Sequence, residues 1–233
     1  MSFGLLFIGI IFMLISMWVG SRLKSKFAEY SQMRLAKNLT GAEVARLMLA
    51  DHGITDVKVM SVEGQLTDHY NPSEKTVNLS PEVYHGVNAA ATAVASHECG
   101  HAVQHATAYS MLGLRSAMVP VQAISGRIQT FLMIALMFGG FALHNFLPTA
   151  IILIIACNVV FTLFALITLP VEFDASNRAL AWVEKRGIVN RQEHDMAKDA
   201  LKWAARTYVV AAIGALATLL YWIMIFMGGQ RDD

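Results

Sequence analysis

Charged residues and cysteines are both scarce in this chain. Only 15% of its 233 residues are charged, against 55% hydrophobic residues, and the mean hydropathy is +0.48. That composition is too apolar for an ordinary soluble domain. The two cysteines, Cys99 and Cys157, provide no disulfide framework, which fits a reducing compartment. The net charge of +1 carries no message by itself, and we expect no nucleic-acid partner.

The apolar residues gather in four long runs. A helix that crosses the hydrocarbon layer needs roughly 20 mostly apolar residues. Four segments satisfy this requirement, and they cover residues 3–20, about 118–143, 148–170 and 208–229. The first run lacks a basic start and is followed by "SRLKSK", so we interpret it as a retained anchor instead of a signal peptide. The second run is the one most interrupted by polar residues, and we expect Arg127 in its early part to extend its charged end toward the membrane interface.

The basic residues predict an orientation. Nine of the 18 Lys and Arg residues lie in 21–116 and seven in 171–206, whereas the turn "HNFLP" between the second and third spans has none. Because Lys and Arg favour the cytoplasmic side, both polar segments should face the cytoplasm and both termini the outside. The expected divisions are a membrane anchor (1–20), a cytoplasmic segment (21–116), a membrane hairpin (117–170), cytoplasmic helices (171–206), and a last span with a short outer tail (207–233).

Local patterns predict a mixed α+β arrangement in the polar segments. Thr40 and Glu43 form a capping-box pattern, and Gly53 stands where that helix would end. Short strands are expected in "ITDVKVMSVEG" and "KTVNLS", separated by the turn-rich "TDHYNPSE". Helices are expected in 27–38, 89–106, 171–187 and 190–207.

The stretch "SHECGHAVQH" carries the most specific chemistry. His97 and His101 are four residues apart, so on a helix both imidazoles share one face. At that spacing both can reach a zinc ion at about 2.0–2.1 Å. Glu98 lies roughly 100° round the helix, where a carboxylate can take a proton from a zinc-activated water, as in the H-E-x-x-H metalloprotease pattern. Cys99 points to the opposite side and is expected to be a spectator.

A catalytic zinc typically takes three protein ligands and leaves one position for water. His105 lies one turn further and should point past the ion, and a metzincin is excluded because the position that would need a histidine is Thr107. The best candidate for the third ligand is Glu172, which we expect in the first turn of a helix that starts at Pro170. His194 remains an alternative. The hairpin of two spans between His101 and Glu172 would return the chain to the side it left.

Four motifs in order resemble the YugP-type bacterial membrane zinc metallopeptidases over nearly the whole chain: "LTGAEVARLML", "LTDHY", "ASHECGHAVQ" and "LPVEFDASNRAL". The chain is more distantly similar to the HtpX and CaaX prenyl protease group. The resemblance implies a zinc metalloendopeptidase of gluzincin-like type, with His97, His101 and Glu172 binding Zn²⁺ and Glu98 as the catalytic base. It also implies a mainly α membrane protein with four transmembrane helices, whose two cytoplasmic segments build a zincin-like α+β domain in the bacterial inner membrane.

The surroundings of the site stay open at the level of sequence. In the distant group an aspartate often follows the ligand glutamate by four residues, but here that position is Ser176, which leaves Asp174 or Asn177 to orient a ligand histidine. The candidate oxyanion donors are His69, Tyr70, Arg178 and Tyr208. An extended peptide could pair with the edge of the "TVNLS" strand, next to Asn78.

Two competing functions remain. One is a membrane scaffold or chaperone-like binder with a structural zinc, and the other is a non-peptidase zinc hydrolase. The expected partners are a membrane-associated protein or peptide substrate and the lipid bilayer.

Overall fold

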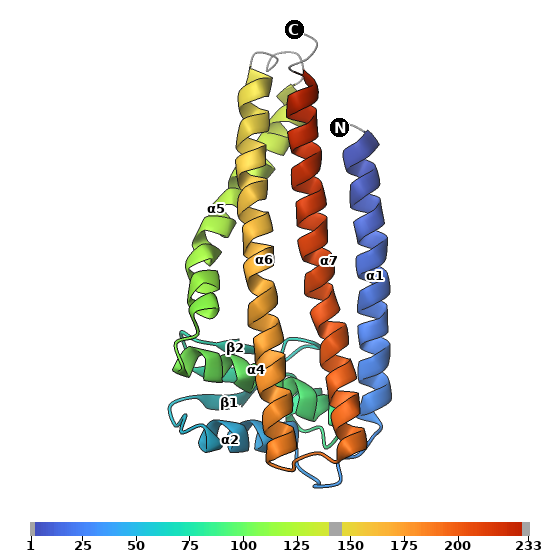
Figure 1. Cartoon of the computed structure of the whole chain (residues 1–233), viewed down its shortest axis with the longest axis vertical. Helices are drawn as coiled ribbons and strands as arrows, with labels where there is room; N and C mark the ends of the chain where they lie inside the picture. The colour runs from blue at the N-terminus through green and yellow to red at the C-terminus, as the bar shows by residue number, and fades with distance from the viewer. Residues whose placement is uncertain (1–2, 140–145, 230–233) are drawn as a thin grey trace. The chain divides into compact units, whose positions relative to one another are not determined.

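The described part of the protein is mainly helical, with a small sheet (Figure 1). The computed structural model describes residues 3–139 and 146–229. Its elements in chain order are α1 (Phe3–Ser31), α2 (Gly41–Asp51), β1 (Lys58–Ser61), β2 (His69–Asn71), β3 (Thr76–Leu79), α3 (Pro81–Tyr84), α4 (Ala89–Ala106), α5 (Ser110–Gly139), α6 (Leu147–Lys185) and α7 (Arg191–Gly229).

The four longest helices are long and apolar enough to cross a membrane, as the sequence predicted. These are α1, α5, α6 and α7, and α5 is the least apolar of them. The second predicted span begins earlier than expected, because α5 starts at Ser110 instead of near Met118. Residues 140–143 of that span, and part of the "HNFLP" turn, lie outside the described residues.

The chain divides into two compact units. Unit 1 consists of Met1–Trp18, Leu114–Leu169 and Thr207–Asp233, and unit 2 consists of Val19–Gly113 and Pro170–Arg206. Within unit 1 many large apolar side chains are exposed, such as Phe131, Phe138 and Met224. An exposed apolar surface on spanning-length helices is the pattern expected where lipid is the solvent.

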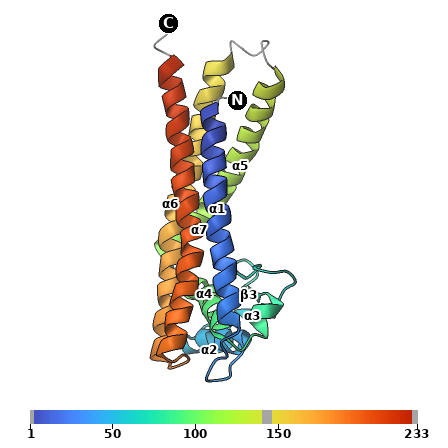
Figure 2. The ribbon, with the colours of Figure 1, turned by 90° about the vertical axis from the view of Figure 1, so that its right-hand side faces the viewer.

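Unit 2 contains the three-stranded sheet in the order β1-β3-β2. β1 pairs with β3 in parallel and β2 pairs with β3 antiparallel. Figure 2 shows α2, α3 and α4 gathered with β3 in this unit. Their apolar faces form one core that includes Val44, Met48, Leu79, Val83 and Val103. Burial of these side chains is the main force that holds a short sheet to its helices.

The start of α2 is capped as its sequence predicted. The Glu43 N–H donates to the Thr40 hydroxyl at 3.2 Å, and the Thr40 N–H donates to the Glu43 carboxylate at 2.8 Å. This reciprocal pair is a capping box. The helix ends where Gly53 takes a positive φ of 69°, a conformation that glycine adopts without strain.

Two local predictions are wrong. The helix expected over 27–38 ends at Ser31, because the chain then turns so that Leu35 enters the core at 1% exposure. The segment "TDHYNPSE", expected to be only a turn, contains β2. Neither the end of α1 at Ser31 nor the strand β2 could be predicted from nearby residues, because each depends on contacts with other parts of unit 2.

A third prediction is also wrong: Pro170 does not begin a helix but lies inside α6. A proline within a helix loses one backbone hydrogen bond because it has no N–H. The residues that follow keep the helical path because Val171, Ala175 and Ala179 are completely buried in unit 2. Glu172 is therefore carried by the middle of a long helix instead of a first turn.

Candidate metal centre

The histidines of the H-E-x-x-H motif project from α4, one turn apart. The helix is capped by Asn88, whose side chain accepts from the Ala91 N–H at 2.8 Å. The ring centroids of His97 and His101 are 4.8 Å apart with the planes nearly perpendicular. Both side chains are largely buried, with 13% and 10% of their surfaces exposed.

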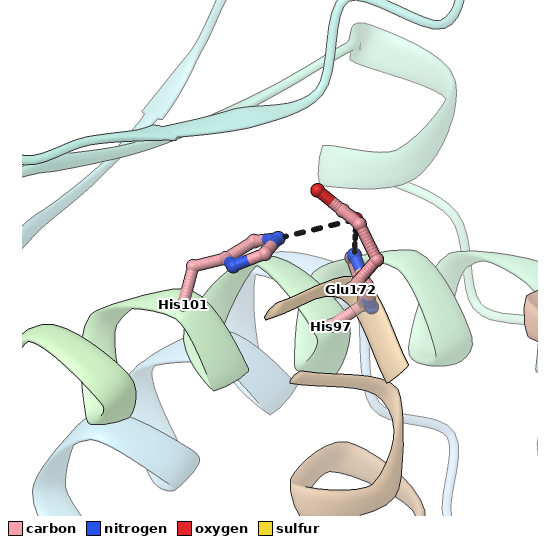
Figure 3. Close-up of side chains that lie close together, drawn as sticks. All are labelled: His97, His101 and Glu172. Carbon is pink, nitrogen blue, oxygen red and sulfur yellow. Dashed lines mark ion pairs between the residues drawn. The ribbon is translucent and has the colours of Figure 1, made fainter. Parts of the chain in front are cut away.

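Glu172 reaches the two histidines from α6 (Figure 3). Its Oε2 lies 3.3 Å from His97 Nε2 and 3.6 Å from His101 Nε2. The donor atoms of these three residues lie within 4.8 Å of one another, and they are the one group among the described residues that could hold a metal ion.

A glycine on α4 permits this approach. A Cβ at Gly100 would lie 2.5 Å from the carbonyl oxygen of Ala175, so the α4 and α6 backbones almost touch there. Ala175 is three residues after Glu172. The close packing of the two helices therefore brings the carboxylate to the histidines.

The electrostatics of the group favour a cation. Burial alone would lower the pKa of the His101 imidazole, but the closeness of Glu172 and the negative charges of Glu98 and Glu172 raise it above its usual value. The surrounding carboxylates therefore favour positive charge at this position in spite of desolvation. Two imidazole nitrogens and one carboxylate oxygen are also the donor types that catalytic zinc takes, so the residues present fit this metal.

A second set of contacts lies behind the two histidines. The Ser176 hydroxyl lies 3.1 Å from His97 Nδ1, and the Gln104 Oε1 lies 3.0 Å from His101 Nδ1. The Gln104 amide nitrogen donates to the Val171 carbonyl and to the Asp174 carboxylate, both at 2.8 Å. In both cases the contact is to Nδ1, so Nε2 is the nitrogen that faces Glu172.

Glu98 lies beside the histidines without joining their donor group. It is buried, with 8% exposure. Its charge acts on a neighbouring carboxyl, Asp68: burial raises the pKa of Asp68, the Ser80 N–H opposes this, and the charge on Glu98 adds to the rise. Asp68 itself is held by the Ser80 N–H at 2.7 Å. The charge of Glu98 also acts on the imidazole of His101, so this carboxylate lies within electrostatic reach of the candidate donor group.

The other residues that the sequence suggested, as orienting residues or oxyanion donors, lie mainly on α6 and β2. Asp174 accepts from Arg178 at 2.6 Å and from Gln104, so it reaches His101 only through Gln104. Asn177 is exposed. Tyr70 contacts His105 Nδ1 at 2.8 Å.

The remaining candidates are not part of the donor group. His69 contacts the Thr67 carbonyl and Asn78. Tyr208 belongs to unit 1. His194 lies 3.9 Å from Glu184 and outside the donor group. Cys99 contacts the Ala45 carbonyl, and burial raises its pKa, so it remains a neutral thiol.

The prediction that the "TVNLS" strand supplies a free edge is wrong. This strand is β3, and Asn78 stands opposite Met60 of β1 on one side and His69 of β2 on the other. The edges of the sheet are β1 and β2. Sequence reasoning made β3 an edge because it did not foresee β2.

Sequence reasoning also missed Gln104, Ser176 and Asp68. One signal for Gln104 was available, since a residue three positions after His101 shares its helix face. Ser176 stands where an orienting aspartate was sought, and its hydroxyl makes a contact of the same kind. Asp68 gave no signal, because its closeness to Glu98 depends on the fold of the strands.

Comparison with known proteins gives the class. Residues 5–227 match the family model described as "Putative neutral zinc metallopeptidase". The chain belongs to this family, whose metal is zinc. It is also 39% identical over 219 residues to the "Putative membrane protease YugP" of Bacillus subtilis (strain 168), covering 94% of this chain and 95% of that protein. No solved structure matches the chain significantly.

Proposed function

We propose that this chain is a membrane-embedded zinc metalloendopeptidase of the gluzincin-like type, with His97, His101 and Glu172 as zinc ligands and Glu98 as general base. The observation that carries the proposal is the convergence of α4 and α6. It brings two imidazoles and a carboxylate within 4.8 Å of one another, and a second buried acid, Glu98, lies next to His97 in the sequence. Family membership supports the same chemistry.

The residues would divide the work of hydrolysis between them. Zinc, when bound, supplies a Lewis acid that polarises the scissile carbonyl and makes water acidic enough to react near neutral pH. Glu98 accepts the proton of the attacking water and then donates it to the leaving amine. The three ligand side chains hold their positions through both steps.

The substrate is proposed to be a protein or peptide close to the membrane. Four candidate spans and a membrane protease relative support a place in the bilayer. The distribution of Lys and Arg supports an inner-membrane protein with unit 2, as a zincin-like domain, in the cytoplasm and both termini outside. An extended peptide would pair with β2, which is an edge strand and packs against α4.

The number of donors argues against a scaffold with a structural zinc. Structural zinc sites are usually closed by four protein ligands. The donor group found in 3–139 and 146–229 has three, and Glu98 stands beside it. A non-peptidase hydrolase would share the same catalytic group, and only substrate assays separate it from a peptidase.

The test is Glu98→Gln in the purified full-length chain. This variant keeps all three ligands, so it should retain about one zinc per chain. It should lose about 10²–10⁴-fold in peptide hydrolysis, because the general base is gone. Glu74→Gln, at an exposed position on the turn before β3, is the matched control and should keep wild-type activity. Wild-type hydrolysis by Glu98→Gln would refute the mechanism, and wild-type protein that cleaves ester or amide substrates but no peptide would favour the non-peptidase reading.

A further inference from the structure

Gln104 is a polar side chain without any exposed surface, one turn beyond His101 on α4. Such a residue is costly to bury unless all of its polar atoms are satisfied. Here its amide nitrogen donates to the Val171 carbonyl and the Asp174 carboxylate, and its amide oxygen faces His101 Nδ1. Every one of these partners lies in unit 2.

The partners of Gln104 leave its amide only one orientation. A backbone carbonyl and a carboxylate can only accept hydrogen bonds, so the group that faces them must be the NH₂. Turning the amide over would set its oxygen against two other oxygens at 2.8 Å. The amide oxygen therefore faces His101, and because this oxygen can only accept, Nδ1 of His101 must carry a hydrogen.

This arrangement selects one tautomer of the histidine. A neutral imidazole with hydrogen on Nδ1 has its lone pair on Nε2. Nε2 is the nitrogen that lies 3.6 Å from Glu172 Oε2. The other histidine is less constrained, because the Ser176 hydroxyl next to His97 Nδ1 can either donate or accept.

We propose that Gln104 is a positioning residue that holds His101 in the Nδ1–H tautomer and orients its Nε2 for zinc. Asp174 and Arg178 continue the chain of contacts, since Arg178 donates to the carboxylate that fixes the Gln104 amide. The inference rests on the proposed function, because it assigns Gln104 a role toward the same metal. Partners of this kind typically change metal affinity about 10–100-fold when they are removed.

The first test is Gln104→Met in the full-length chain in detergent. Methionine keeps nearly the same length and loses both the acceptor and the donor. Zinc affinity, measured by competition with a chromophoric chelator, should fall about 10–100-fold. The matched control is Trp182→Phe, which removes another side-chain hydrogen bond of unit 2, from Trp182 Nε1 to Asp51 at 3.0 Å. The control should bind zinc as the wild type does, and equal affinities in Gln104→Met and the control would overturn the role of Gln104.

The second test needs no folded variant of Gln104. Nitrogen-15 NMR of wild-type protein labelled at histidine distinguishes the two tautomers, and the His101 signals are identified by their loss in His101→Gln. Nδ1 should carry the hydrogen, both with zinc and in zinc-free protein at a pH where the imidazole is neutral. A hydrogen on Nε2 would overturn the inference. Failure of the wild type to bind zinc would instead refute the proposed metal site, while the zinc-free spectrum would still decide the tautomer.

Discussion

Replacing Gly100 with alanine would test whether the close approach of α4 and α6 builds the site. The new Cβ would lie 2.5 Å from the Ala175 carbonyl oxygen and 3.1 Å from its carbonyl carbon and Cα. These atoms belong to the backbone of a buried helix, so no side chain can rotate away. The two helices must therefore separate, or the new methyl group cannot be accommodated.

The size of the effect follows from these distances. Side-chain carbons keep at least 3.0 Å and usually 3.4 Å from such atoms, so α4 and α6 must separate by about 0.5–0.9 Å. Overpacking of this kind costs about 1–3 kcal/mol. Zinc–ligand distances in good sites stay within about 0.2 Å of their standard values, and Glu172 lies on the stretch of α6 that would move. Zinc binding would have to draw the two helices back together against this strain. Since about 1.4 kcal/mol corresponds to tenfold in affinity, we expect zinc binding to weaken roughly 5–150-fold.

The assay is zinc affinity by chelator competition, with thermal unfolding of the zinc-free protein measured alongside. Gly113→Ala is the control, because a Cβ at that helical position meets nothing within 4 Å. Alanine is about 1 kcal/mol better than glycine inside a helix, so the control should be as stable as the wild type or more so. Gly100→Ala with wild-type zinc affinity would refute the claim that this contact sets the position of Glu172.

Three further predictions follow from the same geometry and from the charge pattern. Glu172→Ala should lose zinc on dialysis against a mild chelator whereas His105→Ala retains it, and the opposite result would mean that the third ligand is misassigned. Thr40→Ala should destabilise the protein by about 0.5–2 kcal/mol in denaturant unfolding. The capping box lowers the pKa of Glu43, with its hydrogen bonds from Thr40 as the main cause. A lowered carboxyl pKa stabilises the fold above the unfolded value and this stabilisation is lost as the pH falls, so the difference between Thr40→Ala and wild type should shrink in acid. In intact cells, and without the two native cysteines, a cysteine at Lys75 should resist an impermeant thiol reagent while one at the C-terminal end reacts, and the reverse would overturn the proposed orientation.

Several features of this protein follow from the sequence alone because they depend on neighbours along the chain. Four apolar runs of membrane-spanning length predict the four long helices, which the structure contains. The capping box at Thr40 was predictable because both of its partners lie within one turn. The pairing of His97 with His101 on one face was predictable in the same way, since helical geometry relates residues four apart.

The tertiary structure decided what depends on distant partners. Glu172 lies 71 positions after His101, and only the contact of Gly100 with Ala175 shows how it reaches the histidines. The order of the strands, with β3 in the centre, depends on β2, whose three residues lie in a turn-rich stretch. Pro170 was expected to start a helix, yet burial of the following residues outweighs the one backbone hydrogen bond that proline cannot make. Gln104 acquires its role only where α4 meets α6, because a side chain's partners across a helix interface are set by packing and not by spacing in the sequence.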